Sequence, residues 1–254
     1  MMAFDLSGRV AVVTGGNGGI GLGMAQGLAQ AGASVVIAGR DRDKSLRAVE
    51  QLEQSGARSS AVEVDVLRKD SIERMFEATV ERFGRVDILV TNAGTNIRKP
   101  PQDYTLEEWT EVLDINLRGT FLCAQAAYPH LVRAGGGKII TIGSMTSIFG
   151  ASFAAPYSAS KGGTVQLTKA LASAWAKDNI QVNAVLPGWI DTDLTRRARR
   201  EVAGLEERVQ ARTPQGRWGT PADLAGVGVF LASSASDFIT GVAIPVDGGY
   251  SAQA

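Results

Sequence analysis

The 254-residue sequence contains one cysteine, Cys123, and one histidine, His130. A single cysteine excludes a disulfide within the chain, and with one histidine it leaves no cluster of side chains that could ligate zinc. One histidine, in the stretch Tyr-Pro-His-Leu, also argues against a Ser-His-Asp triad, and we interpret it as a structural residue near a helix end. We therefore expect no metal site and no such triad.

The sequence also lacks an excess of one charge sign and any long apolar run. Lysine plus arginine and aspartate plus glutamate number 26 each, so the composition indicates neither a nucleic-acid partner nor a membrane surface. The sequence contains no run of about 18 apolar residues, so no membrane-spanning helix is predicted. The start, Met1-Met2-Ala3-Phe4-Asp5, lacks the basic region and apolar run of a signal peptide, so we expect a cytoplasmic location.

The composition that remains is that of one sizeable globular unit. Hydrophobic residues make up 44% of the chain, and the mean hydropathy is close to zero. This length is enough for one large α/β core, and no internal repeat, low-complexity stretch or linker divides it. We predict a single domain over residues 1–254.

A glycine-rich segment at residues 15–21 follows the short β-branched run 9–14 and precedes apolar residues at helical spacing. Strand, glycine turn and helix are the context of a dinucleotide-binding turn. There, glycines let the backbone approach a pyrophosphate, and free N–H groups at the helix start bind its charge. Two registers remain open: Gly16, Gly18 and Gly21 fit G-x-G-x-x-G, whereas Gly15, Gly19 and Gly21 fit T-G-x-x-x-G-x-G.

The next strand, predicted at 34–39, is followed by Arg40, about 20 residues after the glycines. An acid at such a position binds the adenosine ribose 2′-hydroxyl of NAD, whereas an arginine accommodates the 2′-phosphate of NADP. Arg40 favours NADP over NAD, although Asp41 and Asp43 stand close by and argue the other way.

Strands and helices alternate along the rest of the chain. Further strands are predicted at 60–66, 86–90, 137–143, 180–186 and 242–246. Helices are predicted from a cap at Asp70 or Ser71, from a Thr105/Glu108 capping box to about residue 133, over 157–176, and over 221–233. This order predicts one doubly wound Rossmann domain, an α/β fold with a seven-stranded, mostly parallel sheet and helices on both faces.

Several polar residues and turns then fall at the carboxyl ends of strands, where such sheets bind ligands. They are the glycine turn, Asp65, Asn92, Ser144 and Pro187. Asn116 lies in a mostly apolar stretch, where a buried amide must be hydrogen-bonded, so structural and functional interpretations are equally open.

Tyr157 and Lys161 are four residues apart and share one face of the predicted helix. A phenol has a pKa of about 10, and a nearby ammonium favours the phenolate and brings its proton within working range at neutral pH. A Tyr/Lys pair alone is a weak signal, because exposed helical pairs of this kind are common. The ligand-binding residues gathered at the strand ends favour the functional interpretation.

With these residues in place, the chain resembles the short-chain dehydrogenase/reductase family across nearly its full length. The resemblance extends to gluconate and glucose dehydrogenase types and to 3-oxoacyl-(acyl-carrier-protein) reductase types. The matching features are Thr14-Gly15…Gly19-Ile20-Gly21, Asp65, Asn92-Ala93-Gly94, Asn116, Ser144, Tyr157…Lys161, Pro187-Gly188 and Thr192. One departure is Thr91, where the family usually has the first Asn of N-N-A-G, and we expect the turn to be retained.

The resemblance implies an NAD(P)-dependent oxidoreductase that interconverts a secondary alcohol and a ketone by hydride transfer, with Tyr157 as the acid/base. Ser144 would bind the substrate oxygen, Lys161 would hold the nicotinamide ribose and lower the Tyr157 pKa, and Asn116 would anchor a proton-relaying water. The implied assembly is a homotetramer, which the small-residue, apolar helices at 112–132 and 157–176 would suit. The implied cofactor-binding residues are Gly15, Asn17, Gly19, Ile20, Gly21, Arg40, Asp65, Val66, Asn92, Gly94, Tyr157, Lys161, Pro187, Gly188, Ile190 and Thr192.

Three segments should shape the substrate pocket: 95–104, 145–156 and a lid at 189–220. The chain is most similar to family members that act on sugar acids, aldoses and polyols, and Arg98 and Lys99 could bind a sugar carboxylate. The alternative is a 3-oxoacyl-(acyl-carrier-protein) reductase, in which the arginine run 196–200 would meet an acidic carrier. A more remote alternative is a regulatory protein that binds the cofactor without turnover.

Overall fold

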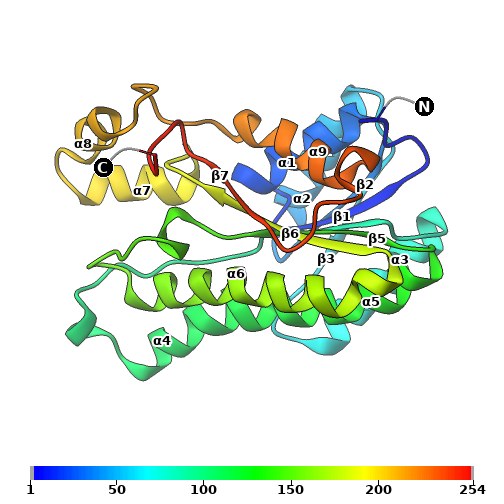
Figure 1. Ribbon diagram of the computed structural model, residues 1–254, viewed down its shortest axis with the longest axis horizontal. Coiled ribbons are helices and arrows are strands. Elements are labelled where there is room, and N and C mark those ends of the chain that lie inside the picture. The colour runs from blue at the N-terminus through cyan, green and yellow to red at the C-terminus, as the bar shows by residue number, and fades with distance from the viewer. Residues whose placement is uncertain (1–2, 253–254) are drawn as a thin grey trace.

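The computed structural model describes residues 3–252, so the first two and last two residues of the predicted domain lie outside the described residues. Within them, seven strands form one sheet in the order β3-β2-β1-β4-β5-β6-β7, and every neighbouring pair is parallel (Figure 1). The predicted doubly wound fold is confirmed. The strands are β1 (Val10–Thr14), β2 (Ser34–Gly39), β3 (Ser59–Glu63), β4 (Ile88–Thr91), β5 (Gly137–Ile142), β6 (Ile180–Pro187) and β7 (Ala243–Val246).

Helices cover both faces of this sheet. α1 (Gly19–Gln30), α2 (Arg42–Gln54) and α9 (Ala225–Ala232) lie on one face. α3 (Lys69–Phe83), α5 (Gly119–Arg133) and α6 (Ala155–Trp175) lie on the other, with α4 (Leu106–Leu113) beside α6. The lid segment contains α7 (Asp193–Glu201) and α8 (Leu205–Arg212), beyond the ends of the strands (Figure 1).

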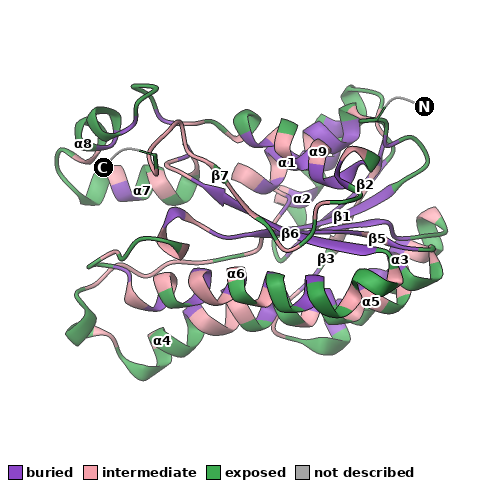
Figure 2. Cartoon of the chain, in the orientation of Figure 1, coloured by how far each residue is buried: buried purple, intermediate pink, exposed green. Residues whose placement is uncertain are grey.

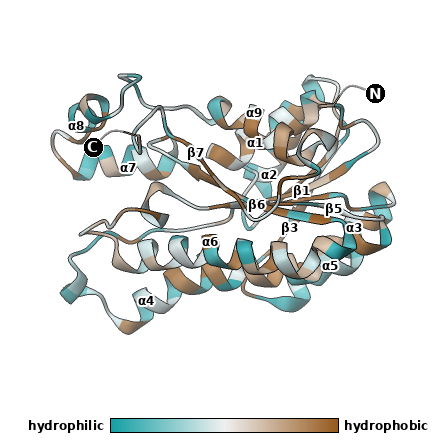
Figure 3. Ribbon diagram, in the orientation of Figure 1, coloured by the Kyte–Doolittle hydropathy of each residue, from teal (hydrophilic) through white to brown (hydrophobic). Residues whose placement is uncertain are grey.

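The core lies in two layers, one on each face of the sheet. All residues of β1 and β6 are buried, because a parallel sheet with helices on both faces has no solvent-facing side (Figure 2). The same strands are hydrophobic along most of their length, whereas the outer helices mix polar and apolar residues (Figure 3). Among the helices of residues 3–252, none is both long enough and apolar enough to cross a bilayer.

Two predicted helix starts need correction. α3 begins at Lys69 after Arg68, with neither Asp70 nor Ser71 as its cap. The Asp70 carboxylate accepts from Arg68 and Arg74 instead, and Ser71 Oγ accepts from the Asp65 main-chain N–H at 3.0 Å. At the other site, residues 221–224 form a 3₁₀ turn, and α9 starts only at Ala225.

The Thr105/Glu108 capping box is present and starts α4. Thr105 Oγ1 accepts from the Glu108 N–H at 3.2 Å, and Glu108 Oε2 accepts from the Thr105 N–H at 3.0 Å. The helical path then continues to Arg133 as predicted, but through a π-helical turn at Asp114–Arg118 that contains Asn116. Such turns are rare and are frequent at functional sites.

Candidate active site

A cavity of about 340 Å³, the candidate cofactor cavity, opens at the carboxyl ends of β1, β4, β5 and β6. It brings together three of the four predicted catalytic residues and most of the predicted cofactor residues. Those that line it are Gly15, Asn17, Gly19, Ile20, Asn92, Gly94, Ser144, Tyr157, Lys161, Pro187, Gly188, Ile190 and Thr192. Gly21, Arg40, Asp65, Val66 and Asn116 do not line it.

The glycine turn between β1 and α1 fits an anionic dinucleotide. Gly15 and Gly19 have φ values of +62° and +52°, a conformation that favours glycine. A Cβ at Gly21 would lie 2.4 Å from the Gly15 carbonyl oxygen, so this close approach also requires glycine. α1 has no side-chain cap and no acid in its first turn, which leaves its N-terminal N–H groups available for a pyrophosphate. Within residues 3–252, no acidic, histidine or cysteine cluster is arranged to hold a metal ion.

The turn after β4 is retained despite Thr91. Asn92 Nδ2 donates to the carbonyl oxygens of Thr14 at 3.2 Å and of Gly15 at 2.9 Å. The main-chain N–H groups of Asn92 and Ala93 both donate to Thr14 Oγ1. These bonds fix the β4 turn to the glycine turn, so the two sides of the cofactor cavity are joined directly.

At the end of β2, the structure separates the two kinds of charge that the sequence left in conflict, the basic Arg40 and the acidic Asp41. Asp41 is the N-cap of α2, and its carboxylate accepts from the Lys44 N–H at 2.9 Å. Arg40 is exposed, and Lys44, which the sequence analysis missed, lines the cofactor cavity beside Gly18. The Asp65 carboxylate accepts from the Leu67 N–H at 3.0 Å in its own turn.

Tyr157 and Lys161 lie on α6, next to Ser144 at the end of β5. Lys161 Nζ donates to the Ile142 carbonyl oxygen at 2.7 Å and lies 5.6 Å from the centroid of the Tyr157 ring. Burial without a carboxylate partner lowers the pKa of Lys161 to about 8.

The pKa of the Tyr157 phenol shifts upward, whereas a nearby ammonium was expected to shift it downward. Burial raises the pKa of Tyr157 above its ordinary value, and this effect outweighs the Ser144 hydroxyl and Arg98, which both lower it. A buried phenolate loses its hydration, which is the physical cause of this rise, and Lys161 is not among the groups that lower the pKa of Tyr157. The cation that lowers the pKa of the phenol is therefore Arg98.

Asn116 is almost completely buried, and its side chain is fully hydrogen-bonded. Oδ1 accepts from the Thr95 N–H at 2.8 Å, and Nδ2 donates to the Thr95 carbonyl oxygen and to Ser160 Oγ, both at 3.0 Å. The amide thereby joins the π-helical turn to the loop after β4 and to α6. This arrangement satisfies the structural interpretation, whereas the water-anchoring role stays a prediction.

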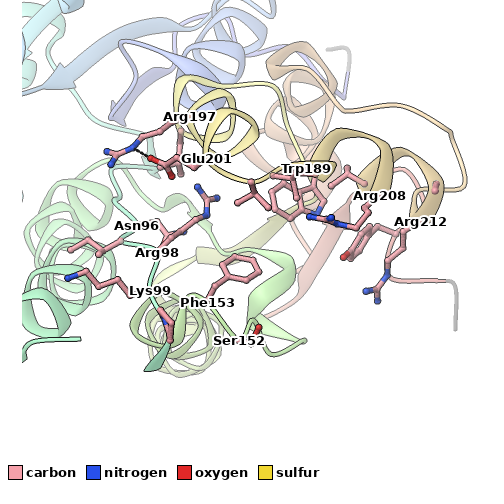
Figure 4. Close-up of a pocket in the computed structure, with 18 of the residues that line it drawn as sticks. Asn96, Arg98, Lys99, Ser152, Phe153, Trp189, Arg197, Glu201, Arg208 and Arg212 are labelled. Carbon is pink, nitrogen blue, oxygen red and sulfur yellow. Dashed lines mark hydrogen bonds and ion pairs between the residues drawn. The ribbon is translucent and has the colours of Figure 1, made fainter. Parts of the chain in front are cut away.

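A second cavity, of about 1590 Å³, lies between the lid and the loops after β4 and β5 (Figure 4). It is lined by residues from all three segments that were expected to shape the substrate pocket. Arg98 points into it, with its guanidinium carbon 6.0 Å from the centroid of the Phe153 ring. Partial burial lowers the pKa of this guanidinium, but an arginine remains cationic at neutral pH.

The structure distinguishes Arg98 from its neighbour Lys99. Lys99 forms an ion pair with Glu108, so its charge is already neutralised. Among the described residues no carboxylate forms an ion pair with Arg98; the nearby Glu201 is bound by Arg197 at 2.6 Å. Of the two cations expected to bind a substrate carboxylate, Arg98 alone is without a carboxylate partner among the described residues.

The arginine run of α7 is largely neutralised within the lid. Arg196 pairs with Asp191 at 3.0 Å, and Arg197 pairs with Glu201. Arg199 also pairs with Asp191 and lies 4.4 Å from the centroid of the Trp218 ring. The Arg196 and Arg199 contacts join α7 to Asp191 and Trp218, and together with the Arg197 pair they weaken the case for an arginine surface facing an acidic carrier.

A glycine turn at a strand end, facing Ser144, Tyr157 and Lys161, defines the class of protein: an NAD(P)-dependent oxidoreductase acting on a secondary alcohol or ketone. A family model described as enoyl-(acyl carrier protein) reductase matches residues 15–251. The chain belongs to the short-chain dehydrogenase/reductase family, as the sequence resemblance indicated.

Relatives of known name match over nearly the whole chain. A 2-dehydro-3-deoxy-D-gluconate 5-dehydrogenase of Escherichia coli (strain K12) is 42% identical over 254 residues, covering 100% of this chain and 99% of the relative. A gluconate 5-dehydrogenase of Gluconobacter oxydans (strain 621H) is 38% identical, covering 97% and 96%. The crystal structure of a gluconate 5-dehydrogenase from Burkholderia cenocepacia J2315 in complex with NADP and tartrate is 38% identical, with a TM-score of 0.94 and coverage of 99% and 98%.

Proposed function

We propose that this protein is an NADP-dependent dehydrogenase that interconverts a hydroxyl-bearing sugar acid and its keto acid. The observation that carries the proposal is Arg98, a partly buried cation without a carboxylate partner, close enough to act on the Tyr157 phenol. A carboxylate bound there bidentately would hold a neighbouring carbinol against Tyr157. The sugar-acid names of the E. coli and Gluconobacter relatives support this substrate class.

The catalytic roles follow from the positions of the side chains. Tyr157 carries its proton at neutral pH because burial raises its pKa, so in the reductive direction it donates that proton to the substrate oxygen. In the oxidative direction Tyr157 must first release its proton along the predicted proton path, and the phenolate oxygen then accepts the proton of the alcohol. Ser144 binds the substrate oxygen, Lys161 binds the ribose hydroxyls near Tyr157, and Asn116 keeps its predicted role in the proton path.

When bound, the nicotinamide supplies or accepts the hydride at the carbinol carbon. The chain's contribution is to bind and orient the cofactor. The glycine turn and the start of α1 would hold the pyrophosphate, and Asn92 and Gly94 would border the adjacent ribose. Pro187, Gly188, Ile190 and Thr192 would border the nicotinamide, while Asp65 and Val66 remain predicted cofactor-binding residues.

NADP is the proposed cofactor because two basic residues border the position of the adenosine ribose. Arg40 follows β2, and Lys44 lies in the first turn of α2 with its side chain over Gly18. Asp41 does not oppose them, because its carboxylate caps α2. The NADP found in the Burkholderia structure agrees with this choice.

We also propose a cytoplasmic homotetramer. Leu106, Trp109 and Phe121 on α4 and α5 expose apolar surface, which suits contact with another copy of the chain. Light scattering at micromolar concentration would report the mass, and a monomer would contradict the assembly.

The test of the proposed function is the absorbance of reduced nicotinamide with purified protein, NADPH or NADH, and a panel of keto-sugar acids, neutral ketoses and acetoacetyl thioesters. We expect oxidation of NADPH with a keto-sugar acid and little with the neutral sugars or the thioester. Turnover of the thioester alone would favour the acyl-carrier alternative. Cofactor binding without turnover of any substrate would favour the non-catalytic alternative.

Two matched variants locate the carboxylate. Arg98→Gln removes the unpaired cation and should raise the KM for the sugar acid about tenfold or more, because a charge-assisted hydrogen bond contributes about 1.5–3 kcal/mol. Lys99→Gln removes a neighbouring cation that is already paired with Glu108 and should change KM less than about threefold. Equal effects of the two variants would contradict the assignment of Arg98.

A further inference from the structure

The large cavity contains a second arginine that resembles Arg98 in its surroundings. Arg212, at the end of α8, has its guanidinium carbon 4.4 Å from the centroid of the Tyr250 ring and 5.9 Å from that of Phe149. Arg98 lies over Phe153 in the same way. Phe149 and Phe153 belong to the same loop, so two aromatic-backed arginines line one cavity from different parts of the chain.

The cations of this cavity fall into two kinds. Lys99 and Arg197 form ion pairs with Glu108 and Glu201. Within residues 3–252, no carboxylate forms an ion pair with Arg98 or Arg212, nor with Arg208, which precedes Arg212 by one helical turn. Unpaired cations that converge on one partly apolar cavity raise its positive potential, and an anionic ligand relieves their repulsion.

Aromatic packing also prepares a guanidinium for binding. A ring against the flat face of an arginine limits its rotamers and leaves the in-plane N–H groups free for a carboxylate or phosphate. Figure 4 shows Arg98 near the middle of the cavity and Arg212 at one end, beyond Trp189 and Arg208. The volume of about 1590 Å³ also exceeds the roughly 300–1,000 Å³ of ordinary small-molecule sites, so a ligand can extend past Arg98.

We propose that Arg212, assisted by Arg208, forms a second anion subsite, and that the preferred substrate is a sugar acid with two anionic groups. One carboxylate would bind Arg98 beside Tyr157, and the second group, a carboxylate or a phosphate, would bind Arg212. This inference rests on the proposed function, since it takes Arg98 as the first anchor. It narrows the substrate class from sugar acids in general to aldaric or phosphorylated aldonic acids.

The test is calorimetric binding to the enzyme–NADPH complex, which does not turn over ligands in the alcohol form. The three ligands are D-gluconate with one carboxylate, D-glucarate with two, and 6-phosphogluconate with a carboxylate and a phosphate. We expect at least one bis-anionic ligand to bind about tenfold more tightly than gluconate, because a second charge-assisted contact is formed. The ligand that binds more tightly than gluconate, whether glucarate or 6-phosphogluconate, identifies the second group as a carboxylate or a phosphate.

Arg212→Gln should remove this advantage and leave gluconate affinity within about twofold, whereas Arg212→Lys should retain part of it. The matched control is Arg200→Gln, which removes an exposed arginine of α7 that does not line the cavity and should change neither affinity. Equal affinities of all three ligands for the wild-type protein, or an equal loss for gluconate and the bis-anion in Arg212→Gln, would overturn the subsite.

Different variants test the two proposals. The proposed function fails if Arg98→Gln leaves both gluconate affinity and keto-acid turnover unchanged. The second subsite fails if bis-anionic ligands keep their advantage over gluconate in Arg212→Gln while Arg98→Gln still weakens gluconate binding. Because Arg212 is exposed, neither of its variants should change the melting temperature appreciably.

Discussion

Lys44 Nζ lies 3.2 Å from Asp193 Oδ2, and this ion pair joins α2 to the first residue of α7 across the cofactor cavity. Both side chains are substantially exposed, so the pair itself contributes little to stability. Its position is more informative than its energy, because Lys44 is held over Gly18, where the adenosine end of a dinucleotide would lie. A bound 2′-phosphate would compete with Asp193 for this ammonium.

Replacing Lys44 by Gln should weaken the binding of NADPH more than that of NADH. The two cofactors differ by the 2′-phosphate, so loss of a cation near it should raise the Kd of NADPH about three- to tenfold and leave that of NADH within about twofold. Asp193→Asn releases Lys44 from its partner and should keep or tighten NADPH binding. Fluorescence titration with both cofactors measures these constants.

Lys69→Gln is the matched control for Lys44. Lys69 is also an exposed lysine in the first turn of a helix, it pairs with Glu73 at 3.6 Å, and it does not line the cofactor cavity. An equal loss of NADPH and NADH affinity in Lys44→Gln would show that Lys44 does not act on the 2′-phosphate.

Tyr157→Phe should lower kcat by at least about 10²–10⁴-fold at saturating cofactor, because the proton of the substrate oxygen loses its donor and acceptor. The ring remains in place, so NADPH affinity and thermal stability should stay close to the wild-type values. Steady-state rates with a keto-sugar acid measure the effect. Turnover near the wild-type rate would exclude Tyr157 as the acid/base.

The sheet was predictable because its signals are local. Buried parallel strands such as β1 and β6 appear in the sequence as short apolar runs, and most changes of direction are marked by glycine or proline; the connections at 64–68 and 176–179 are exceptions. The placement of the glycine turn, Asn92, Ser144 and Tyr157 around one cavity was predictable for the same reason, since each stands at a fixed place relative to a strand or helix. The bounds of β2 are as predicted, and other strand bounds moved by up to three residues, as at β3, which ends at Glu63 rather than Val66.

The charges around the site were not predictable, because they depend on contacts between distant parts of the chain. Arg98 and Lys99 are equivalent in the sequence, and only the fold shows that Glu108 neutralises Lys99. Lys44 was missed because its partner lies 149 residues away. The lid helices α7 and α8 were also missed, since their few apolar residues pack against a cavity and give a weak periodic signal.

The free energy of unfolding should depend on pH through Lys161. Burial lowers its pKa from 10.5 to about 8, so between these values the unfolded chain binds more protons than the folded one, and stability rises with pH. The gain from Lys161 between about pH 7 and pH 9 is about 1 kcal/mol by this linkage. At about pH 7 and below, the buried lysine is almost fully protonated and the protein is least stable with respect to this group.

Lys161→Met isolates this contribution, because the wild-type minus variant difference cancels the other titrating groups. Urea unfolding at the two pH values should show the wild type gaining stability relative to the variant at the higher pH. The variant should also lose both turnover and cofactor affinity. A difference that does not change with pH would mean that Lys161 titrates near its ordinary pKa, and a loss confined to substrate affinity would contradict its binding to the ribose.

We predict that Tyr104 positions Arg98. Its hydroxyl donates to the Ile97 carbonyl oxygen at 2.5 Å, and the Lys99 N–H donates to the Phe153 carbonyl oxygen at 3.1 Å, so both neighbours of Arg98 are held in place. Tyr104→Phe keeps the ring and removes one hydrogen bond, worth about 0.5–1.5 kcal/mol. The KM for the sugar acid should rise about two- to tenfold with little change in kcat, because only the carboxylate anchor is loosened.

The matched control for this change is Tyr128→Phe. Tyr128 also donates one hydrogen bond, to Asp178 at 2.9 Å, but it lies on α5 away from both cavities. Tyr128→Phe should lose about as much stability as Tyr104→Phe and should leave the KM for the sugar acid unchanged. If Tyr104→Phe lowers kcat and leaves KM unchanged, the loop acts on the Tyr157 proton rather than on the carboxylate. That result would favour Arg98 as the residue that sets the Tyr157 pKa, and the sugar-acid assignment would lose its structural support.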